Sequence, residues 1–166
     1  MILLTTNKKK FKGCGSLLDS LGIELVVPDK PLMEPQGDSL VEVAVGKARM
    51  AAIQVGHEVL VDDAGLELLS WPGFPGPMTG FVLKTLGKAG LERLLDGNKE
   101  AEMVCVLAWS DGNRIRYWTG RSRGFVDVTI TVNPGGPGPL ASWFVSDDVG
   151  LAHRRRALEA FGREMS

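Results

Sequence analysis

The sequence has few cysteines, almost no net charge and no long hydrophobic run, and each shortage excludes a class of protein. Cys14 and Cys105 are the two cysteines among 166 residues, too few for a disulfide scaffold and too far apart for a zinc knuckle. A formal net charge of −1 attracts neither nucleic acid nor an acidic membrane. No apolar run approaches the roughly 18 residues of a membrane span. We therefore expect a soluble, cytoplasmic protein that binds no nucleic acid polymer and no membrane.

The composition that remains is typical of a globular domain. Hydrophobic residues make up 44% and charged residues 23% of the chain, which excludes disorder because enough apolar surface is available to offset the ordering entropy. Candidate strands and helices alternate first, and strands then cluster. This order favours an α/β mixed sheet with α+β character over a bundle or a sandwich. We expect residues 1–166 to form a single domain.

Hydrophobic spacing predicts where the elements lie. Strands are expected over residues 1–6, 23–27, 57–61, 101–110, 113–123, 124–132 and 141–146. Helices are expected after Asn7, from about Ser39 to Gln54, over 78–95 with a break around Gly87, and over 151–165. The segments 71–77 and 133–139 are rich in Pro and Gly, so they are expected to be loops.

The most unusual stretch is VLVDDAG at residues 59–65, where an apolar run meets two adjacent carboxylates, Asp62 and Asp63. Charges about 5 Å apart repel by about 3 kcal/mol at an effective dielectric near 20. Water relieves this repulsion if Asp-Asp-Ala-Gly is a hairpin turn, with residues 66–70 as the return strand. A bound cation relieves it if the pair lies in a cleft. Mg²⁺ prefers carboxylate oxygens, and Glu42 is the obvious third ligand.

Two segments near the N-terminus are candidates with equally plain structural explanations. TTNKKK at residues 5–10 ends a strand ahead of a helix, so its backbone donors and Lys10 could bind phosphate. The same stretch is explained by Asn7 as a helix cap followed by solvated lysines. Ser39 and Glu42 form a capping box, which needs no function. Lys47 is by default a solvated residue on a helix face.

The segment AHRRRAL at residues 152–158 begins the last expected helix with a cluster of positive charge. Cations at a helix N-terminus oppose the helix dipole. The conflict indicates either an anionic or base-edge partner for His153 and its neighbours, or a solvated basic face.

Taken in order, these stretches resemble the inosine triphosphate pyrophosphatase family over nearly the whole chain. TTNKKK is similar to the family's phosphate loop, VEVAVGKARMAA to its acidic helix, and AHRRRAL to its closing SHR motif. The run from VDDAGLEL through GFPGP to LKTLGKAGLERLL is similar to its central signature.

The resemblance implies an elongated α/β domain with a central cleft, usually a homodimer. Such an enzyme cleaves ribo- or deoxynucleoside triphosphates, including those of deaminated purines, to monophosphate and pyrophosphate with Mg²⁺. Carried over by position, the metal ligands would be Glu42, Asp62 and Asp63, and Asp63 would activate the attacking water. The substrate contacts would be Thr5, Thr6, Asn7, Lys10 and Lys47 at the phosphates, and His153 and Arg154 at the base.

The chain departs from the family pattern at the end that reads the base. An aromatic and acidic stretch is expected near residues 136–142, where this chain has GPGPLAS. The phosphate-facing lysine upstream of the closing motif is absent, with Asp147 and Asp148 nearby. Because discrimination between bases needs paired polar groups, we expect an altered base preference. The alternatives are a catalytically weak descendant that binds a nucleotide or a protein, and an unrelated phosphate-binding α/β protein.

Overall fold

The computed structural model describes residues 1–130, 143–148 and 152–165, and in these residues seven strands form one mixed sheet. The strand order is β2-β1-β3-β5-β6-β7, with β4 paired to β3 beside this path. β1 runs parallel to β2 and β3, and the other pairs are antiparallel. The strands are β1 (Ile2–Leu4), β2 (Glu24–Val26), β3 (Val59–Leu68), β4 (Trp71–Gly76), β5 (Glu100–Ser110), β6 (Ile115–Val126) and β7 (Phe144–Ser146).

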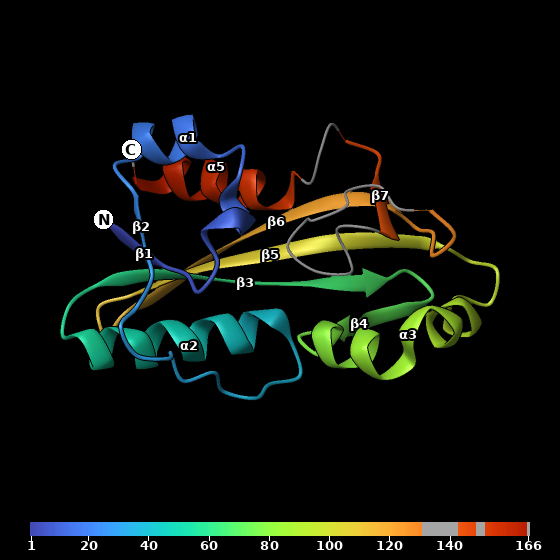
Figure 1. Cartoon of the computed structure of the whole chain (residues 1–166). Coiled ribbons are helices and arrows are strands. Elements are labelled where there is room, and N and C mark those ends of the chain that lie inside the picture. The colour runs from blue at the N-terminus through green and yellow to red at the C-terminus, as the bar shows by residue number, and fades with distance from the viewer. Residues whose placement is uncertain (131–142, 149–151, 166) are drawn as a thin grey trace.

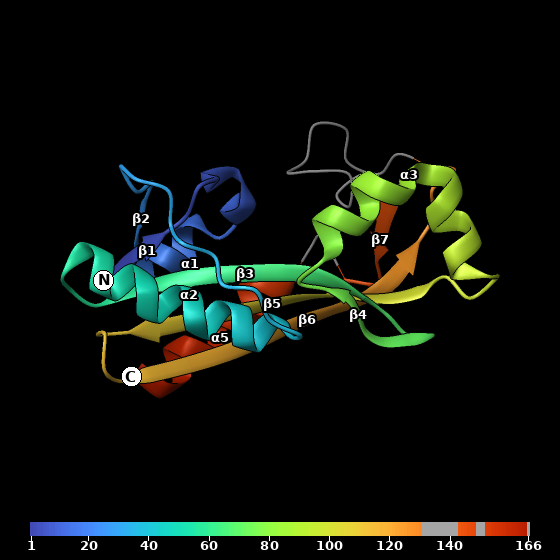
Figure 2. The same cartoon turned by 90° about the horizontal axis from the view of Figure 1, so that it is seen from below.

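The helices lie on both sides of the long strands β3, β5 and β6. They are the 3-10 helix Lys8–Phe11 and the α-helices α1 (Gly15–Ser20), α2 (Leu40–Val55), α3 (Thr79–Leu95) and α5 (His153–Met165). Figure 1 shows α1 and α5 above the strands and α2 below them. Figures 1 and 2 agree that α3, β4 and β7 lie toward one end of the long strands, and β1, β2 and α1 toward the other. The predicted mixed-sheet α/β architecture is confirmed.

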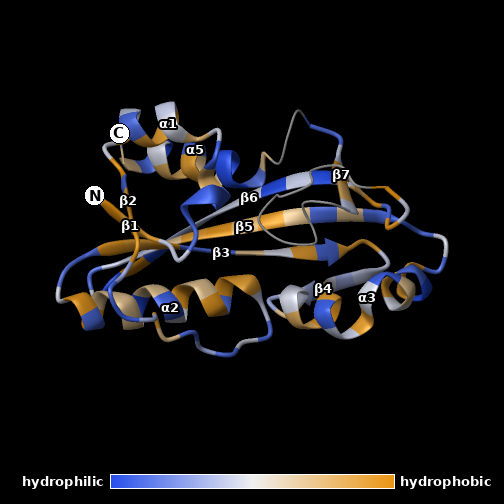
Figure 3. Cartoon of the chain, viewed as in Figure 1, coloured by the Kyte–Doolittle hydropathy of each residue, from blue (hydrophilic) through white to orange (hydrophobic). Residues whose placement is uncertain are grey.

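Two hydrophobic clusters sandwich the centre of the sheet, and strand alternation decides which residues enter each. Leu60 of β3 and Leu107 of β5 pack with Leu158 of α5. Val61 of β3 and Val106 of β5 pack with alanines of α2. β5 is hydrophilic at its start and hydrophobic along most of its remaining length (Figure 3). Even-numbered residues at the centre of β3 therefore face α5, and odd-numbered residues face α2.

Two predicted features of the helices are confirmed, the N-terminus of α2 and the break inside α3, and each has a local cause. The helix predicted from Ser39 is α2, and the Ser39 side chain accepts a hydrogen bond from the Glu42 amide as its N-cap. The predicted break at Gly87 is present inside α3, where this glycine has φ +60° and ψ −167°. That backbone conformation is open to glycine and unfavourable for other residues.

Of the two alternatives for Asp62–Gly65, the hairpin turn is wrong. β3 runs unbroken for ten residues, and each of them pairs with β5, with Asp62 opposite Leu107 and Asp63 opposite Val106. The chain reverses only after Leu68, where residues 71–76 return as β4 beside β3, although a loop was predicted there. Prolines are tolerated in β4 because it lies at the edge of the sheet.

The remaining differences lie in the second half of the chain. The separate strand predicted from residue 124 is wrong, because Gly124–Val126 complete β6. The predicted loop 133–139 and the first residues of the predicted strand 141–146 lie outside the described residues, while Phe144–Ser146 form the expected strand. Among the described helices, none combines the length and the apolar character needed to cross a bilayer.

Gly120 of β6 provides a test of how closely α5 packs on the sheet. A Cβ at this position would overlap the His153 carbonyl oxygen and the Ala157 nitrogen of α5. We expect Gly120→Ala to lower the free energy of unfolding by about 3 kcal/mol, since overpacking against backbone cannot relax through a side chain. Urea denaturation measures this. Gly80→Ala is the control, because a Cβ there meets nothing within 4 Å, and a loss as large in the control would contradict the explanation.

Candidate functional site

Asp62 and Asp63 are neighbours in the middle of β3, so their side chains leave opposite faces of the sheet. Asp62 points toward α5, where its Oδ2 accepts a hydrogen bond from Arg154 Nε at 3.3 Å. Both side chains are buried, with 3% of Asp62 and 8% of Arg154 exposed. The ion pair therefore lies inside the protein and connects the central strand to the last helix.

Asp63 lies on the other face, in the wall of a cavity of about 690 Å³. The cavity is lined by Glu34, Pro35, Gln36, Gly37, Asp38, Val43, Asp63, Pro72, Gly73, Phe74, Pro75, Pro77 and Met78. Burial raises the pKa of Asp63 to about 6, and the carboxylates of Asp62 and Glu34 act in the same direction. The ammonium groups of Lys47 and Lys10 oppose this rise. Asp63 is thus a carboxyl that titrates near neutral pH inside a cavity.

The cavity wall formed by β4 and the residues that follow it is fixed to β3 by two hydrogen bonds of Thr79. Thr79 Oγ1 accepts from the Leu66 amide at 2.9 Å and donates to the Gly76 carbonyl at 2.6 Å. A Cβ at Gly65 would overlap that same Gly76 carbonyl oxygen. Glycine at position 65 therefore lets the end of β4 approach β3 closely, two residues from Asp63.

Lys47 of α2 is buried and is not the solvated face residue that its sequence context suggested. Its Nζ donates to Glu34 Oε1 at 2.8 Å and to the Asp62 backbone carbonyl at 3.3 Å. Lys47 thereby holds a second carboxylate at the cavity and fixes the backbone of the acidic pair. Glu34 was missed in the sequence because it lies in an irregular Pro-rich connection with no motif to mark it.

Glu42, predicted as a metal ligand, makes capping hydrogen bonds at the start of α2. Its amide donates to Ser39 Oγ at 3.2 Å, and its Oε2 accepts from the Asp38 amide at 2.9 Å. It does not line the cavity. Among the described residues, no three His, Cys, Asp or Glu side chains are grouped so that they could hold a metal ion. The structure thus does not bring Glu42, Asp62 and Asp63 together.

The predicted phosphate segment begins beside the acidic pair. Leu4, the last residue of β1, pairs with Val61, so Thr5 and the residues after it leave the sheet next to Asp62. Thr5 Oγ1 accepts from the Asn7 amide at 3.2 Å. Asn7 Oδ1 accepts from the Lys9 amide at 3.0 Å and caps the 3-10 helix. Thr6 is exposed, and Lys10 is close enough to lower the pKa of Asp63.

His153 and Arg154, predicted to face the base, are buried at the start of α5. His153 is completely buried, and burial, followed by the charge of Arg154, lowers its pKa to about 3. Arg154 Nη1 lies 2.8 Å from His153 Nε2. Because arginine can only donate, Nε2 accepts and the proton resides on Nδ1, which has no hydrogen-bond partner among the described residues. Neither side chain lines the cavity at Asp63, and residues 136–142 lie outside the described part.

Comparison with known proteins agrees with this fold and these motifs. A family model described as the Ham1 family matches residues 1–138. The dITP/XTP pyrophosphatase of Methanopyrus kandleri is 33% identical over 175 aligned residues, which cover 97% of this chain and 93% of that protein. The inosine triphosphate pyrophosphatase of Aspergillus oryzae is 34% identical, with 97% of this chain and 91% of the relative covered.

A solved structure shows the same fold. The HAM1 protein from Coxiella burnetii superposes with a TM-score of 0.71 at 24% identity, covering 99% of this chain and 97% of that one. The match to the family model extends over most of the chain, and the curated relatives align almost from end to end. This protein therefore belongs to the Ham1 family, in agreement with its sequence resemblance to inosine triphosphate pyrophosphatases.

Proposed function

We propose that this protein is a hydrolase that cleaves nucleoside triphosphates to monophosphate and pyrophosphate, with Asp63 at the reacting centre. The observation that carries the proposal is Asp63 itself, a cavity carboxyl whose pKa is raised to about 6 by burial. A general base is most effective when its pKa lies near the working pH. The names of the relatives, dITP/XTP pyrophosphatase and inosine triphosphate pyrophosphatase, support the reaction class.

We further propose that the enzyme uses Mg²⁺, which Asp63 and Glu34 would hold. These carboxylates line one cavity, and oxygen donors of this kind suit Mg²⁺, which keeps several of its waters. The raised pKa of Asp63 supports this fit, because the nearby lysines do not fully offset its buried charge. The ion would neutralise triphosphate charge and lower the pKa of a bound water. Asp62 would join these ligands only if its ion pair with Arg154 opened. Glu42 would join them only if its hydrogen bond with the Asp38 amide opened.

The residues around the cavity would have different roles in the reaction. Asp63 accepts the proton of the attacking water, and Lys47 keeps Glu34 beside it. Thr5, Thr6, Asn7 and Lys10 bind the phosphates, because their segment leaves β1 next to the acidic pair. Contact of His153 and Arg154 with the base, the homodimer and the cytoplasmic location are expectations carried over from the family resemblance.

Asp63→Asn tests the assignment of the reacting carboxylate. We expect turnover to fall by about 1,000-fold, since an amide cannot accept the proton. Pyrophosphate release is measured with Mg²⁺ and with EDTA, and EDTA is expected to abolish it in the wild type. Asp19→Asn, an exposed acid on α1, is the control and keeps wild-type rates. Full activity of Asp63→Asn would show that another group activates the water.

A panel of triphosphates tests the altered base preference. We expect ITP, XTP, ATP and GTP, in ribo and deoxy forms, to differ in kcat/KM by less than about 100-fold, the range available without paired polar groups at the base. Steady-state pyrophosphate release measures the ratios. A preference of about 10,000-fold for one base would contradict relaxed recognition, and no turnover of any nucleotide would favour a binding role.

The raised pKa of Asp63 also predicts how stability depends on pH. The pKa of Asp63 in the folded protein, about 6, exceeds the ordinary aspartate value of 3.8, so folding favours the protonated acid, and the folded state loses stability as the pH rises through 6. In EDTA, the free energy of unfolding of the wild type, compared with that of Asp63→Asn, should fall by up to about 3 kcal/mol between about pH 4 and about pH 7. Chemical denaturation of both proteins measures the difference. Added Mg²⁺ should make this difference in unfolding free energy smaller at neutral pH. A difference that does not change with pH would contradict the prediction.

A further inference from the structure

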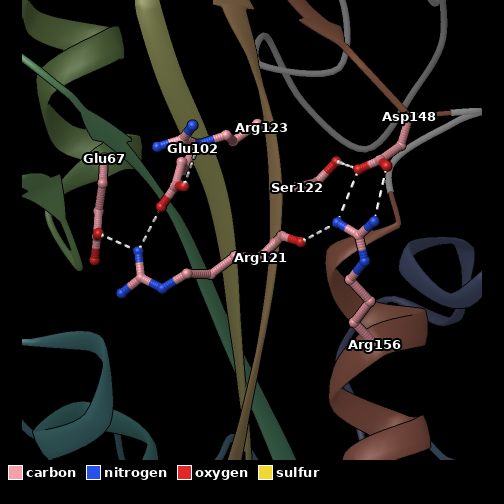
Figure 4. Close-up of polar contacts among 7 residues, drawn as sticks. All are labelled: Glu67, Glu102, Arg121, Ser122, Arg123, Asp148 and Arg156. Carbon is pink, nitrogen blue, oxygen red and sulfur yellow. Dashed lines mark hydrogen bonds and ion pairs between the residues drawn. The ribbon is translucent and has the colours of Figure 1, made fainter.

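Arg156 joins the first turns of α5 to strand β6 and to Asp148, which lies just after β7 (Figure 4). Its Nη1 and Nη2 donate to the two carboxylate oxygens of Asp148 at 2.9 and 2.8 Å, which is a bidentate pair. Nη1 also donates to the backbone carbonyl of Arg121 in β6 at 2.6 Å. Parallel bonds between a guanidinium and a carboxylate fix both distance and orientation. The start of α5 is thus held in a defined position.

Both acceptors of Arg156 are themselves fixed. Asp148 Oδ2 accepts from Ser122 Oγ at 2.9 Å, and the Asp148 amide donates to Ser146 Oγ at 3.1 Å. The Arg121 side chain leaves the opposite side of β6, where its Nη1 donates to Glu67 and Glu102 at 2.7 and 2.8 Å. Arg156 therefore binds to atoms with little freedom to follow it.

The position of α5 matters because Arg154 lies two residues before Arg156. Arg154 reaches across to Asp62 on β3, and the α5 backbone lies directly on Gly120 of β6. Each residue of a helix advances the chain by about 1.5 Å, so a shift of one residue would break a 3.3 Å contact between Arg154 and Asp62. Asp62 would then be a buried charge without its partner, next to Asp63.

We propose that Arg156 and Asp148 are positioning residues that hold α5 where Arg154 binds Asp62, so that the buried carboxylate next to Asp63 keeps its charged partner. The effect on catalysis rests on the proposed function. Asp147 and Asp148 lie near the place where the family resemblance leads one to expect a phosphate-facing lysine, and in the structure Asp148 pairs with Arg156 of α5.

The test must separate positioning from the small general effect of a surface ion pair, since such pairs contribute little to stability. α5 offers a matched control in Arg155, which donates to Glu159 at 2.9 Å and is exposed. Arg155→Gln and Arg156→Gln remove the same charge one residue apart. Asp148→Asn is the second variant, which keeps the helix sequence intact if Arg156→Gln fails to fold.

The first measurement needs no substrate. The Nε–H signal of Arg154 in a ¹⁵N–¹H spectrum, assigned by its loss in Arg154→Lys, reports the contact with Asp62. We expect its exchange with water to become about tenfold faster in Arg156→Gln and Asp148→Asn, because the buried contact opens more often. Arg155→Gln should leave it unchanged. An unchanged signal in folded Arg156→Gln and Asp148→Asn would overturn the proposal, whether or not the protein hydrolyses nucleotides.

The second measurement is steady-state kinetics on a nucleotide that the wild type hydrolyses. We expect Arg156→Gln to lower kcat by about tenfold with KM within about twofold, since an unpaired Asp62 charge would disturb the reacting carboxylate beside it, and such a disturbance slows chemistry more than binding. Arg156→Lys, which keeps the charge but not the bidentate geometry, should recover part of kcat. Equal kcat in the Arg155→Gln and Arg156→Gln proteins would overturn the positioning role.

Discussion

The structure depends on one constraint, the placement of two adjacent carboxylates in the middle of a strand whose every residue pairs with β5. A strand sends successive side chains to opposite faces, so the backbone itself separates Asp62 from Asp63. Each acid then meets a different environment. Asp62 is compensated by Arg154 of α5, and Asp63 enters a cavity in which burial raises its pKa to about 6. The repulsion expected from the sequence is reduced on one face by the ion pair of Asp62 with Arg154. On the other face, the charge of Asp63 has no such partner among the described residues.

The elements around β3 follow from this division. On the Asp62 face, α5 lies against the glycine at position 120 so that Arg154 can reach the strand, and the contacts of Arg156 keep the helix there. On the Asp63 face, Lys47 contacts both Glu34 and the backbone of the acidic pair. The hydrophobic clusters supply most of the stability, while these few polar contacts decide where the charges lie.

A buried acid with a raised pKa lowers stability at neutral pH, because its charged form is poorly solvated. Natural proteins retain such groups mainly at functional sites, where activity needs a local environment that stability alone would remove. Asp63 fits this pattern, since the other charged groups of β3 are paired: Asp62 with Arg154, and Glu67 with Arg121. Among the acids of β3, Asp63 makes no side-chain hydrogen bond to any described residue, and it is the one that faces the cavity.

The sequence by itself determined the family resemblance, the mixed-sheet class, the start of α2 at its Ser39 cap and the break at Gly87, because motifs, caps and glycine conformations are local properties. Only the tertiary structure decided that Asp-Asp-Ala-Gly continues a strand, since pairing with β5 along ten residues outweighs a local turn preference. It also brought Glu34 to Lys47, thirteen positions later in the chain, and joined Asp148 to Arg156. Contacts between separate elements leave no periodic or local signal, so no reading of neighbouring residues could supply them.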